Sequence, residues 1–353
     1  MSTQKSLLLL EAKADYVLNR AYPIPQPGKD EILVKIKASA INPGDYWVKS
    51  LGKVPGRAEG FPIITGFDIA GDVVKLGEGV TKFKVGDRVF FAGNFDPAYG
   101  GFQEYTLTDV DTAAIIPPGL SYDDGSTLSV SFATGYIGLY GVVPLGLGLK
   151  SILTDGGIGA YSGKAIFIAG GSSSSGVAAI QLAKLSGFTY IVTTSSLHNR
   201  AYLQGFGATH VLDRKLSPEQ LASELKNIKG LPKLEYAFDA YGDENTSFAA
   251  ATAALSPGGR VVTVSPVIGG AAGDLPDGKV KSTFMAVKGI PVSRAYYVEL
   301  FAGIEKLLED GSIKPARSEV LPGGLTGVDE GLKRIEKGQV SGVKLVIHPE
   351  DTP

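Results

Sequence analysis

The stretch Lys164–Gly187 (KAIFIAGGSSSSGVAAIQLAKLSG) contains, in immediate succession, the features of a strand, a glycine-rich turn and a helix. It begins with a short apolar run of the kind found in buried strands. After the turn, Val177, Ile180 and Ala183 recur at helical spacing, and Gly187 follows where such a helix would end. The stretch therefore predicts a strand–turn–helix unit.

The residues that follow repeat this alternation of strand and helix. Strands are expected at four further places, with helical stretches between most of them: Tyr190–Thr194, His210–Asp213, Leu234–Asp239 and Arg260–Val264. Strands that alternate with helices at this spacing predict a parallel, doubly wound sheet. The middle of the chain is therefore expected to form an α/β domain.

The first third of the chain is richer in strands. In Glu31–Asn42 most apolar and polar residues alternate, which is typical of a half-buried strand, and short strands follow at Ile69–Leu76 and Arg88–Ala92. Strands this short and this close together predict a small barrel or sandwich. A last strand, Lys344–Ile347, is expected to return to this β-rich part.

The length of 353 residues fits two domains, at about 150 residues each. We expect a barrel-like, β-rich domain from residues 1–132 and 302–353, and an α/β domain from residues 133–301. Hydrophobic residues make up 44% of the chain and charged residues 20%. This composition is sufficient for two cores and excludes a disordered chain.

Charge and cysteine content exclude several classes of function. With 34 basic and 36 acidic side chains, the chain lacks the dense basic face that nucleic acids and anionic membranes require. Cysteine is absent, which excludes thiolate metal sites and a cysteine nucleophile. Histidine occurs three times, which argues against a histidine-rich metal site. The uncharged, glycine-containing stretch Gly125–Leu149 is expected to be a buried segment rather than a membrane span. These features predict a soluble, cytoplasmic protein.

The glycine-rich turn has the form Gly171-x-Ser173-x-x-Gly176, close to the dinucleotide-binding pattern. In that pattern the first glycine makes the tight turn, the second lets the backbone approach the pyrophosphate, and the third lets helix and strand pack closely. Serine is a small substitute at the middle position. A purely structural loop is the alternative, but the strand–turn–helix context favours cofactor binding by the whole turn: Gly170, Gly171, Ser172, Ser173, Ser174, Ser175 and Gly176.

The end of the next predicted strand indicates which cofactor binds. An NAD enzyme places an acid there to hold the ribose diol, whereas this chain has Ser195 and Ser196, followed by Asn199 and Arg200. Hydroxyl groups and a guanidinium can bind a 2′-phosphate, and Arg214 is a second candidate for this contact. The sequence therefore predicts NADPH, with a solvated helix position as the alternative reading for Arg200.

Several further segments occur in a specific order and spacing: Asn42–Asp45 (NPGD), Gly71–Phe90 (GDVVKLGEGVTKFKVGDRVF), Gly101–Tyr105 (GFQEY), Pro257–Val262 (PGGRVV) and Ser341–Val346 (SGVKLV). Together they resemble motifs of the medium-chain dehydrogenase/reductase superfamily, and more closely of its zinc-free quinone reductase and enoyl reductase branches. This resemblance implies a GroES-like catalytic domain, barrel-like and β-rich, beside a Rossmann domain.

The departures from the superfamily pattern are specific too. Zinc-dependent members carry a cysteine where this chain has Asn42 and a histidine where it has Phe67, so no metal is expected. An extension at Leu145–Ser162 and the segment Thr194–Asn199 (TSSLHN) are similar to fungal zinc-free members, including trans-acting enoyl reductases that serve polyketide synthases. Some of those enoyl reductases carry a lysine where this chain has Trp47.

The resemblance also implies which residues are catalytic, among them Asn42 and Thr134, and that Ser265 and Lys344 bind the cofactor. Four are expected near the nicotinamide, in a cleft between the two domains: Asn42, Thr134, Ser265 and Lys344. A helix-interior hydroxyl is the alternative for Thr134, and a surface position is the alternative for Lys344. Tyr46 is the candidate proton donor, with bulk water as its rival.

An apolar slot for the substrate is expected to be lined by aromatic residues of the same motifs, for which core packing is the alternative: Tyr46, Trp47, Phe67, Phe91, Phe95 and Tyr99. The function implied is a metal-free, NADPH-dependent reduction of a quinone or an α,β-unsaturated carbonyl. A trans-acting enoyl reductase of a polyketide pathway, with a synthase as partner, and a non-catalytic NADPH-binding protein are the alternatives. Both monomer and homodimer remain open.

Overall fold

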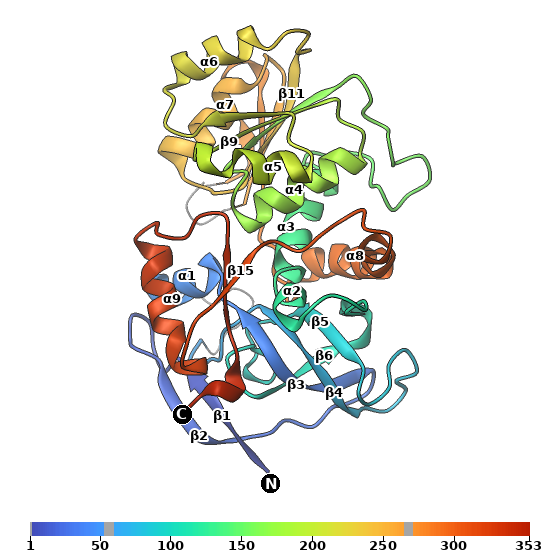
Figure 1. Cartoon of the computed structure of the whole chain (residues 1–353), viewed down its shortest axis with the longest axis vertical. Helices are drawn as coiled ribbons and strands as arrows, with labels where there is room; N and C mark the ends of the chain where they lie inside the picture. Colours follow the sequence, from blue (N-terminus) through green and yellow to red (C-terminus); the bar gives the residue numbers. More distant parts are fainter. Residues whose placement is uncertain (1, 53–59, 265–270) are drawn as a thin grey trace. The chain divides into compact units, whose positions relative to one another are not determined.

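The computed structural model describes residues 2–52, 60–264 and 271–353. The chain divides into two compact units, each built around its own sheet (Figure 1). Unit 1 comprises residues 1–130, 287–309 and 314–353, and unit 2 comprises residues 131–286 and 310–313. The predicted α/β class, with one β-rich and one doubly wound domain, is confirmed.

Unit 2 contains a seven-stranded sheet in the order β10-β9-β8-β11-β12-β14-β13. Its strands are parallel except for the short edge strand β13, which pairs antiparallel with β14. The order reverses at β8, because the chain first builds outward through β9 and β10 and then returns to β11. The strands are β8 (Ala165–Ala169), β9 (Tyr190–Ser195), β10 (His210–Asp213), β11 (Leu234–Asp239), β12 (Arg260–Thr263), β13 (Gly273–Asp274) and β14 (Val280–Thr283).

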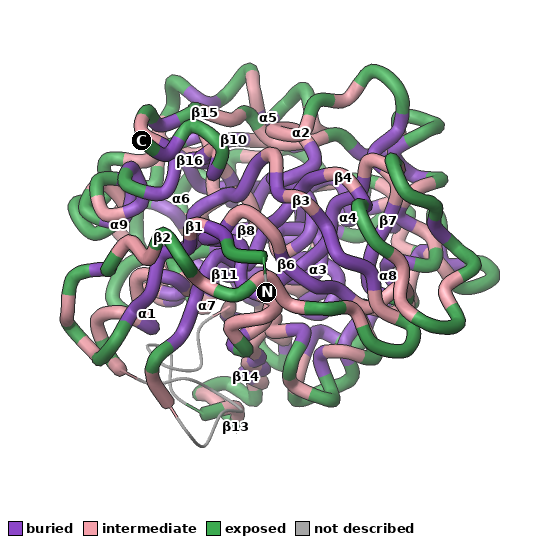
Figure 2. Tube along the Cα trace, turned by 90° about the horizontal axis from the view of Figure 1, so that it is seen from below, coloured by how far each residue is buried: buried purple, intermediate pink, exposed green. Residues whose placement is uncertain are grey.

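Helices lie on both faces of this sheet. The crossovers α4 (Ser174–Leu185) and α5 (Arg200–Phe206) pack together on one face, and α6 (Pro218–Asn227) packs with α7 (Ala249–Ala254) on the other (Figure 1). This split follows from right-handed crossovers that run in opposite directions from β8. Because both faces are covered, all five residues of β8 are buried (Figure 2).

The uncharged stretch forms α3 (Ser129–Tyr140), which is buried along nearly its whole length. Its glycines allow close packing, since a Cβ on Gly138 would lie 2.3 Å from the ring of Phe238, and one on Gly135 would lie 3.1 Å from Leu182. The prediction of a buried segment therefore holds for α3, whereas Val142 and Val143, later in the same stretch, are exposed. No helix in the described part of the chain is long and apolar enough to cross a membrane.

Unit 1 contains a mostly antiparallel sheet in the order β15-β16-β3-β4-β5-β7, with β6 paired to β3, and a separate β1-β2 hairpin. The long, bulged strand β3 pairs with three neighbours, β4, β6 and β16, which curves the sheet towards the predicted barrel. The strands are β1 (Thr3–Leu8), β2 (Val17–Pro23), β3 (Glu31–Ala40), β4 (Asp68–Leu76), β5 (Arg88–Ala92), β6 (Tyr105–Asp109), β7 (Ala113–Ile115), β15 (Ser318–Val320) and β16 (Lys344–Ile347).

The helices of unit 1 are α1 (Pro43–Leu51), α2 (Tyr122–Gly125), α8 (Pro291–Glu309) and α9 (Val328–Glu336). The expected boundary at residue 302 would place most of α8 in the other domain, whereas the structure groups the whole helix with unit 1. Two contacts explain this. The ring of Phe301 lies 5.7 Å from that of Phe90 on β5, and Glu305 Oε1 accepts the N–H of Ile115 at 2.8 Å.

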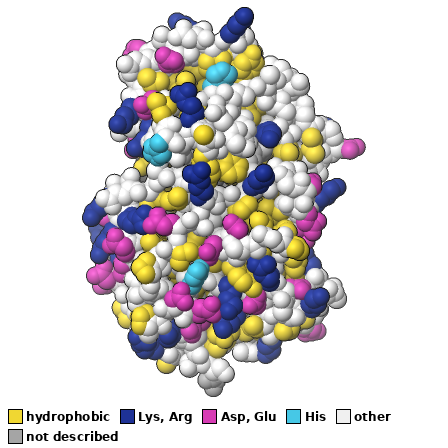
Figure 3. Space-filling view, in the orientation of Figure 1, with side chains coloured by type: hydrophobic (Ala, Val, Ile, Leu, Met, Phe, Trp, Pro, Cys, Tyr) yellow, Lys and Arg dark blue, Asp and Glu magenta, His cyan; other side chains and the backbone are white. Residues whose placement is uncertain are grey.

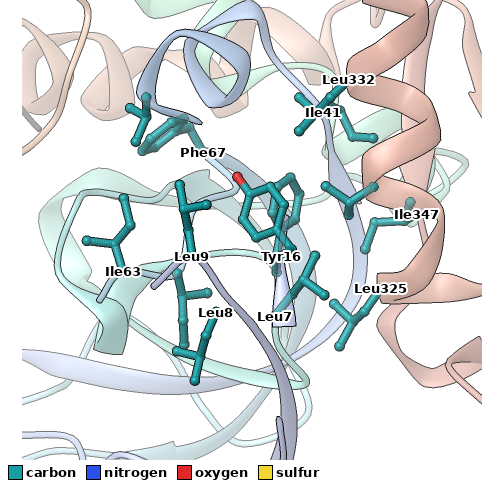
Figure 4. Close-up of a cluster of buried hydrophobic side chains, with 14 of the residues drawn as sticks. Leu7, Leu8, Leu9, Tyr16, Ile41, Ile63, Phe67, Leu325, Leu332 and Ile347 are labelled. Carbon is teal, nitrogen blue, oxygen red and sulfur yellow. The ribbon is translucent and has the colours of Figure 1, made fainter. Parts of the chain in front are cut away.

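An apolar cluster fills the space between the β1 strand, the loop before β4 and α9 (Figure 4). The N-terminal leucine run contributes Leu7, Leu8 and Leu9 to it, whereas Leu10 is exposed. Around the ring of Tyr16 the cluster also gathers Ile41, Ile63, Phe67, Leu325, Leu332 and Ile347. On the face shown in Figure 3, basic and acidic side chains are intermingled, in keeping with the net charge of −2.

Replacing Phe301 tests whether α8 is an integral part of unit 1. Phe301→Ala should lower the free energy of unfolding by about 3–5 kcal/mol, because a ring that is 2% exposed leaves a cavity beside Phe90. Urea unfolding followed by tryptophan fluorescence reports on unit 1, since the single Trp47 lies on α1. Val292→Ala, at an exposed position of the same helix, should change stability little. A small effect of Phe301→Ala would contradict the packing described.

Candidate functional site

The glycine-rich turn links β8 to α4 at the point where the strand order reverses. Gly170 has a φ of 75°, which favours glycine. A Cβ on Gly171 would lie 2.0 Å from Thr193 Oγ1, and a Cβ on Gly176 would lie 2.4 Å from the carbonyl oxygen of Gly170. These glycines are therefore required by the close approach of helix and strand, as the sequence pattern predicts.

Ser173 does more than replace a glycine. It is the N-cap of α4, where its Oγ accepts the N–H of Gly176 at 3.0 Å. The same hydroxyl donates to the carbonyl oxygen of Ala240, after β11, at 3.1 Å. The N–H groups in the first turn of α4 have no acceptor within the helix, so this end of the helix can bind the pyrophosphate of a dinucleotide. Ser172, Ser174 and Ser175 beside it are half-buried.

The residues predicted to choose the cofactor lie at the carboxyl ends of β9 and β10. Ser195 is buried, and its Oγ donates to the carbonyl oxygen of Ser196 and lies 3.5 Å from Nδ2 of the buried Asn199. Arg214 follows β10, and its N–H donates to the carbonyl oxygen of Ser195 at 3.1 Å. The structure thus brings Arg214 next to the serines, while Arg200 begins α5; both arginines are exposed.

The sequence reasoning did not identify Asp239, the fully buried last residue of β11. Its Oδ1 accepts the N–H groups of Tyr241 and Gly242 at 3.2 and 3.0 Å, and its Oδ2 accepts the hydroxyl of Thr263 at 2.9 Å. Burial raises the pKa of Asp239, and these donors oppose the rise. The available signal was an acid at the carboxyl end of a central strand, where α/β sheets bind ligands.

In unit 1, Asn42 and Lys344 meet although 302 positions separate them. Lys344 Nζ donates to Asn42 Oδ1 at 3.0 Å and forms an ion pair with Asp68. Asn42 Nδ2 donates to Asp68 Oδ2 at 3.0 Å and to the carbonyl oxygen of Ala40 at 3.3 Å. All three side chains are buried, and the N–H of Val130 donates to the second oxygen of Asp68 at 2.7 Å. Asp68 is another site residue that the sequence analysis missed.

Asp45, in the same motif as Asn42, is fully buried. Its carboxylate accepts the N–H groups of Asn42 and Gly66 at 2.8 and 2.7 Å, so it ties the start of α1 to the loop before β4. Burial raises the pKa of Asp45 to about 7, and these hydrogen bonds oppose the rise. Asp45 therefore holds the backbone around Asn42 in place.

The structure brings only some of the predicted substrate-slot residues together. Phe67 and Phe95 contact each other edge-to-face at 5.1 Å in the cluster of Figure 4. Phe91 instead packs in the barrel core, fully buried. The hydroxyl of Tyr46 donates to Glu336 Oε1 at 3.0 Å, and the hydroxyl of Tyr99 bonds to Glu31. The remaining member, Trp47, is half-buried on α1.

Of the residues expected near the nicotinamide, Thr134 lies buried on α3 in unit 2, and Ser265 falls outside the described residues. Among the described residues, no group of three or more His, Asp or Glu side chains could hold a metal ion. The position that carries a zinc ligand in related enzymes is Phe67, which offers no donor atom. At the other such position, both N–H groups and the oxygen of the Asn42 amide are engaged within the protein.

The pKa of Asp45 predicts how stability depends on pH. Because the folded state keeps this proton at pH values where the unfolded chain has lost it, its contribution is full below about pH 4 and is lost as the pH rises through 7. A shift of about three pKa units corresponds to about 4 kcal/mol. Asp45→Asn should therefore flatten the fall in unfolding free energy between pH 4 and 8, as measured by urea unfolding. Asp15→Asn, whose side chain is 92% exposed, should leave the slope unchanged. Parallel slopes for Asp45→Asn and wild type would contradict this.

Comparison with known proteins finds two family models and a relative that match this chain. Residues 28–118 match the family model of the alcohol dehydrogenase GroES-like domain, and residues 176–304 match that of the zinc-binding dehydrogenases. A trans-enoyl reductase of Gibberella fujikuroi is 32% identical over 344 residues, covering 92% of this chain and 93% of that protein.

Two solved structures show the fold. An alcohol dehydrogenase superfamily protein from Novosphingobium aromaticivorans has a TM-score of 0.79 at 23% identity, with 98% of this chain and 99% of that one covered. A mycobacterial protein solved with NADPH has a TM-score of 0.73 at 21% identity, with 98% and 100% covered. The resemblance read from the sequence is confirmed: the chain is an oxidoreductase of the medium-chain dehydrogenase/reductase superfamily, related to the fungal trans-enoyl reductases.

Proposed function

We propose that this chain is an NADPH-dependent reductase that uses no metal and transfers a hydride to the β-carbon of an α,β-unsaturated carbonyl compound, with enoyl thioesters as the leading substrate class. The observation that carries the proposal is the buried Asn42–Asp68–Lys344 network at the position where related enzymes bind zinc. The name of the Gibberella relative, a trans-enoyl reductase, supports the substrate class. Quinones remain the alternative acceptors.

The cofactor assignment rests on the end of β9. Ser195 and Ser196 stand where an acid would bind the ribose diol, and Arg214 follows the adjacent strand in register with them. A 2′-phosphate there would accept hydrogen bonds from hydroxyl and guanidinium groups, which are stronger when one partner is charged. The pyrophosphate would bind at the N-terminus of α4, and the bound nicotinamide supplies the hydride.

Replacing the arginines tests the choice of cofactor. Arg200→Ala and Arg214→Ala should each raise the Kd for NADPH about ten- to hundredfold, since a hydrogen bond to a charged group is lost, and leave the Kd for NADH unchanged. Fluorescence titration with both nucleotides measures this. Lys215→Ala, at the exposed position next to Arg214, serves as the control. Equal affinity of the wild type for NADH and NADPH would contradict the assignment.

The acceptor is proposed to bind beside Asn42 and Phe67 of unit 1. In unit 1, the first turn of α1 and Phe67 pack together, since a Cβ on Gly44 would lie 3.7 Å from the Phe67 ring. The proton for the α-carbon would come from water or from Tyr46. If Tyr46 donates it, its hydroxyl must leave Glu336, with which it forms a hydrogen bond at 3.0 Å.

Changes around this pocket should alter the acceptor and not the cofactor. Phe67→Ala should shift relative kcat/KM among enones, enoyl thioesters and quinones by about tenfold, because an aromatic wall is removed, while the Kd for NADPH stays within a few-fold. Tyr46→Phe distinguishes the proton donors: kcat for enones falls if Tyr46 donates and is unchanged if water does. NADPH consumption assays measure both variants. An unchanged acceptor profile in Phe67→Ala would place the pocket elsewhere.

A bulky residue at Ser173 provides the complementary test. Ser173→Phe should abolish NADPH binding and turnover together, because the side chain would fill the space that the pyrophosphate needs. A wild-type protein that binds NADPH but reduces no enone, enoyl thioester or quinone would instead support the alternative of a non-catalytic NADPH-binding protein.

A further inference from the structure

A continuous set of hydrogen bonds runs from β12 through β11 to the N-terminus of α4. Thr263 on β12 donates to Asp239 Oδ2, and Asp239 Oδ1 accepts the N–H groups of Tyr241 and Gly242. Between these residues, the carbonyl oxygen of Ala240 accepts the hydroxyl of Ser173 at 3.1 Å. Residues 240–242, the β11 turn, therefore connect the carboxylate to the glycine-rich turn.

The β11 turn is held closely on the side of β8 as well. The N–H of Ala240 donates to the carbonyl oxygen of Ala169 at 3.0 Å, and a Cβ on Gly170 would lie 3.2 Å from Cβ of Tyr241. The carbonyl oxygen that receives the Ser173 hydroxyl is thus fixed by main-chain pairing on one side. Asp239 fixes the following two N–H groups on the other.

Burying the carboxylate of Asp239 to hold this turn costs free energy. Its side chain is fully buried, and the described groups that hydrogen-bond to it are neutral: two backbone N–H groups and the hydroxyl of Thr263. A buried carboxylate without a cation costs free energy that neutral donors only partly return. Its placement directly behind the cofactor turn points to a positioning role.

The side chain of Ser173 is the reason why the β11 turn must be held in place. The dinucleotide-binding pattern has glycine at this position because the backbone must approach the pyrophosphate, and a side chain free to rotate there would obstruct it. In this chain the Ser173 hydroxyl is held by one donor and one acceptor, Gly176 N–H and the Ala240 carbonyl. The serine is therefore compatible with a dinucleotide only while the β11 turn keeps its acceptor in place.

We propose that Asp239 is a positioning residue for the cofactor turn, which holds the β11 turn so that the Ser173 hydroxyl stays bound to Ala240 and out of the pyrophosphate site. The proposal rests on the proposed function, since it requires a bound dinucleotide. It predicts that Asp239 matters for cofactor binding through Ser173 and not through the fold in general.

A double-mutant cycle tests this coupling. Asp239→Ala should raise the Kd for NADPH about tenfold, or about 1.4 kcal/mol, because the released Ser173 side chain would obstruct the pyrophosphate, while kcat at saturating NADPH should stay within a few-fold of wild type. Ser173→Gly should bind NADPH at least as tightly as wild type, because glycine needs no acceptor and is a tolerable N-cap. In the Ser173→Gly background, Asp239→Ala should then change the Kd by less than about twofold.

Two further variants separate positioning from a loss of stability. Asp239→Asn keeps an oxygen for the N–H groups of Tyr241 and Gly242, so it should bind NADPH nearly as well as wild type. Thr252→Val is the matched control, because its hydroxyl lies buried in the same unit without a partner among the described residues. It should leave the Kd unchanged.

The outcomes distinguish the two proposals. Suppose that wild type binds NADPH. If Asp239→Ala leaves the Kd for NADPH unchanged, or raises it by the same factor in the wild-type and Ser173→Gly backgrounds, the positioning role is wrong and the proposed function stands. If wild type binds neither NADPH nor NADH, the proposed function and the positioning role both fall. Non-additivity confined to the Asp239–Ser173 pair supports the inference.

Discussion

The nucleotide-binding unit depends on how closely the N-terminus of α4 approaches the ends of β8 and β9. At Gly171 and Gly176 there is no room for even a Cβ, because Thr193 and the Gly170 carbonyl occupy the space. This contact sets the direction of the first-turn N–H groups of α4, which are proposed to bind the pyrophosphate. Beside this approach, the hydroxyl of Ser173 donates to the carbonyl oxygen of Ala240 in the turn after β11.

Unit 1 depends on a different constraint, the burial of charge. Lys344 and Asp68 are each nearly inaccessible, and a buried pair of this kind is tolerated only when its remaining donors and acceptors are satisfied. Asn42 bonds to both partners, and the N–H of Val130 at the start of α3 takes the remaining carboxylate oxygen. Burial of the nearby Asp45 raises the pKa of its carboxyl group to about 7. Asp68 is thus paired with a buried lysine, whereas Asp45 accepts hydrogen bonds from backbone N–H groups.

The sequence predicted the features that depend on local pattern. The β8–turn–α4 unit, the parallel sheet and the strand-rich first third follow from periodicity and glycine placement, and the structure confirms them. Contacts between distant residues were not predictable in this way. Nothing near Ser173 in the chain indicates that its hydroxyl bonds to Ala240, 67 positions later. The pairing of Asp68 with Lys344 is equally unpredictable, because it arises only where β4 and β16 both lie beside β3. The period-2 pattern also cannot separate Phe91, which faces the barrel core, from Phe67, which joins a second cluster.

The unit 1 network also bears on which hydride acceptor suits the proposed reaction. Hydride addition to an isolated ketone leaves a localised alkoxide, which needs a strong positive charge or a proton donor beside the oxygen. Here the charge of Lys344 is already balanced by Asp68. The amide of Asn42 already forms hydrogen bonds with Asp68, Ala40 and Lys344. Neither side chain therefore offers a substrate oxygen much positive charge or a free hydrogen-bond donor. Addition to the β-carbon of an enone or enoyl thioester leaves an enolate whose charge is shared between the oxygen and the α-carbon. That charge requires less stabilisation at any one atom, and water or a tyrosine hydroxyl can complete the reaction by protonating the α-carbon. A substrate that brings its own conjugation therefore fits a site whose polar groups are occupied with one another.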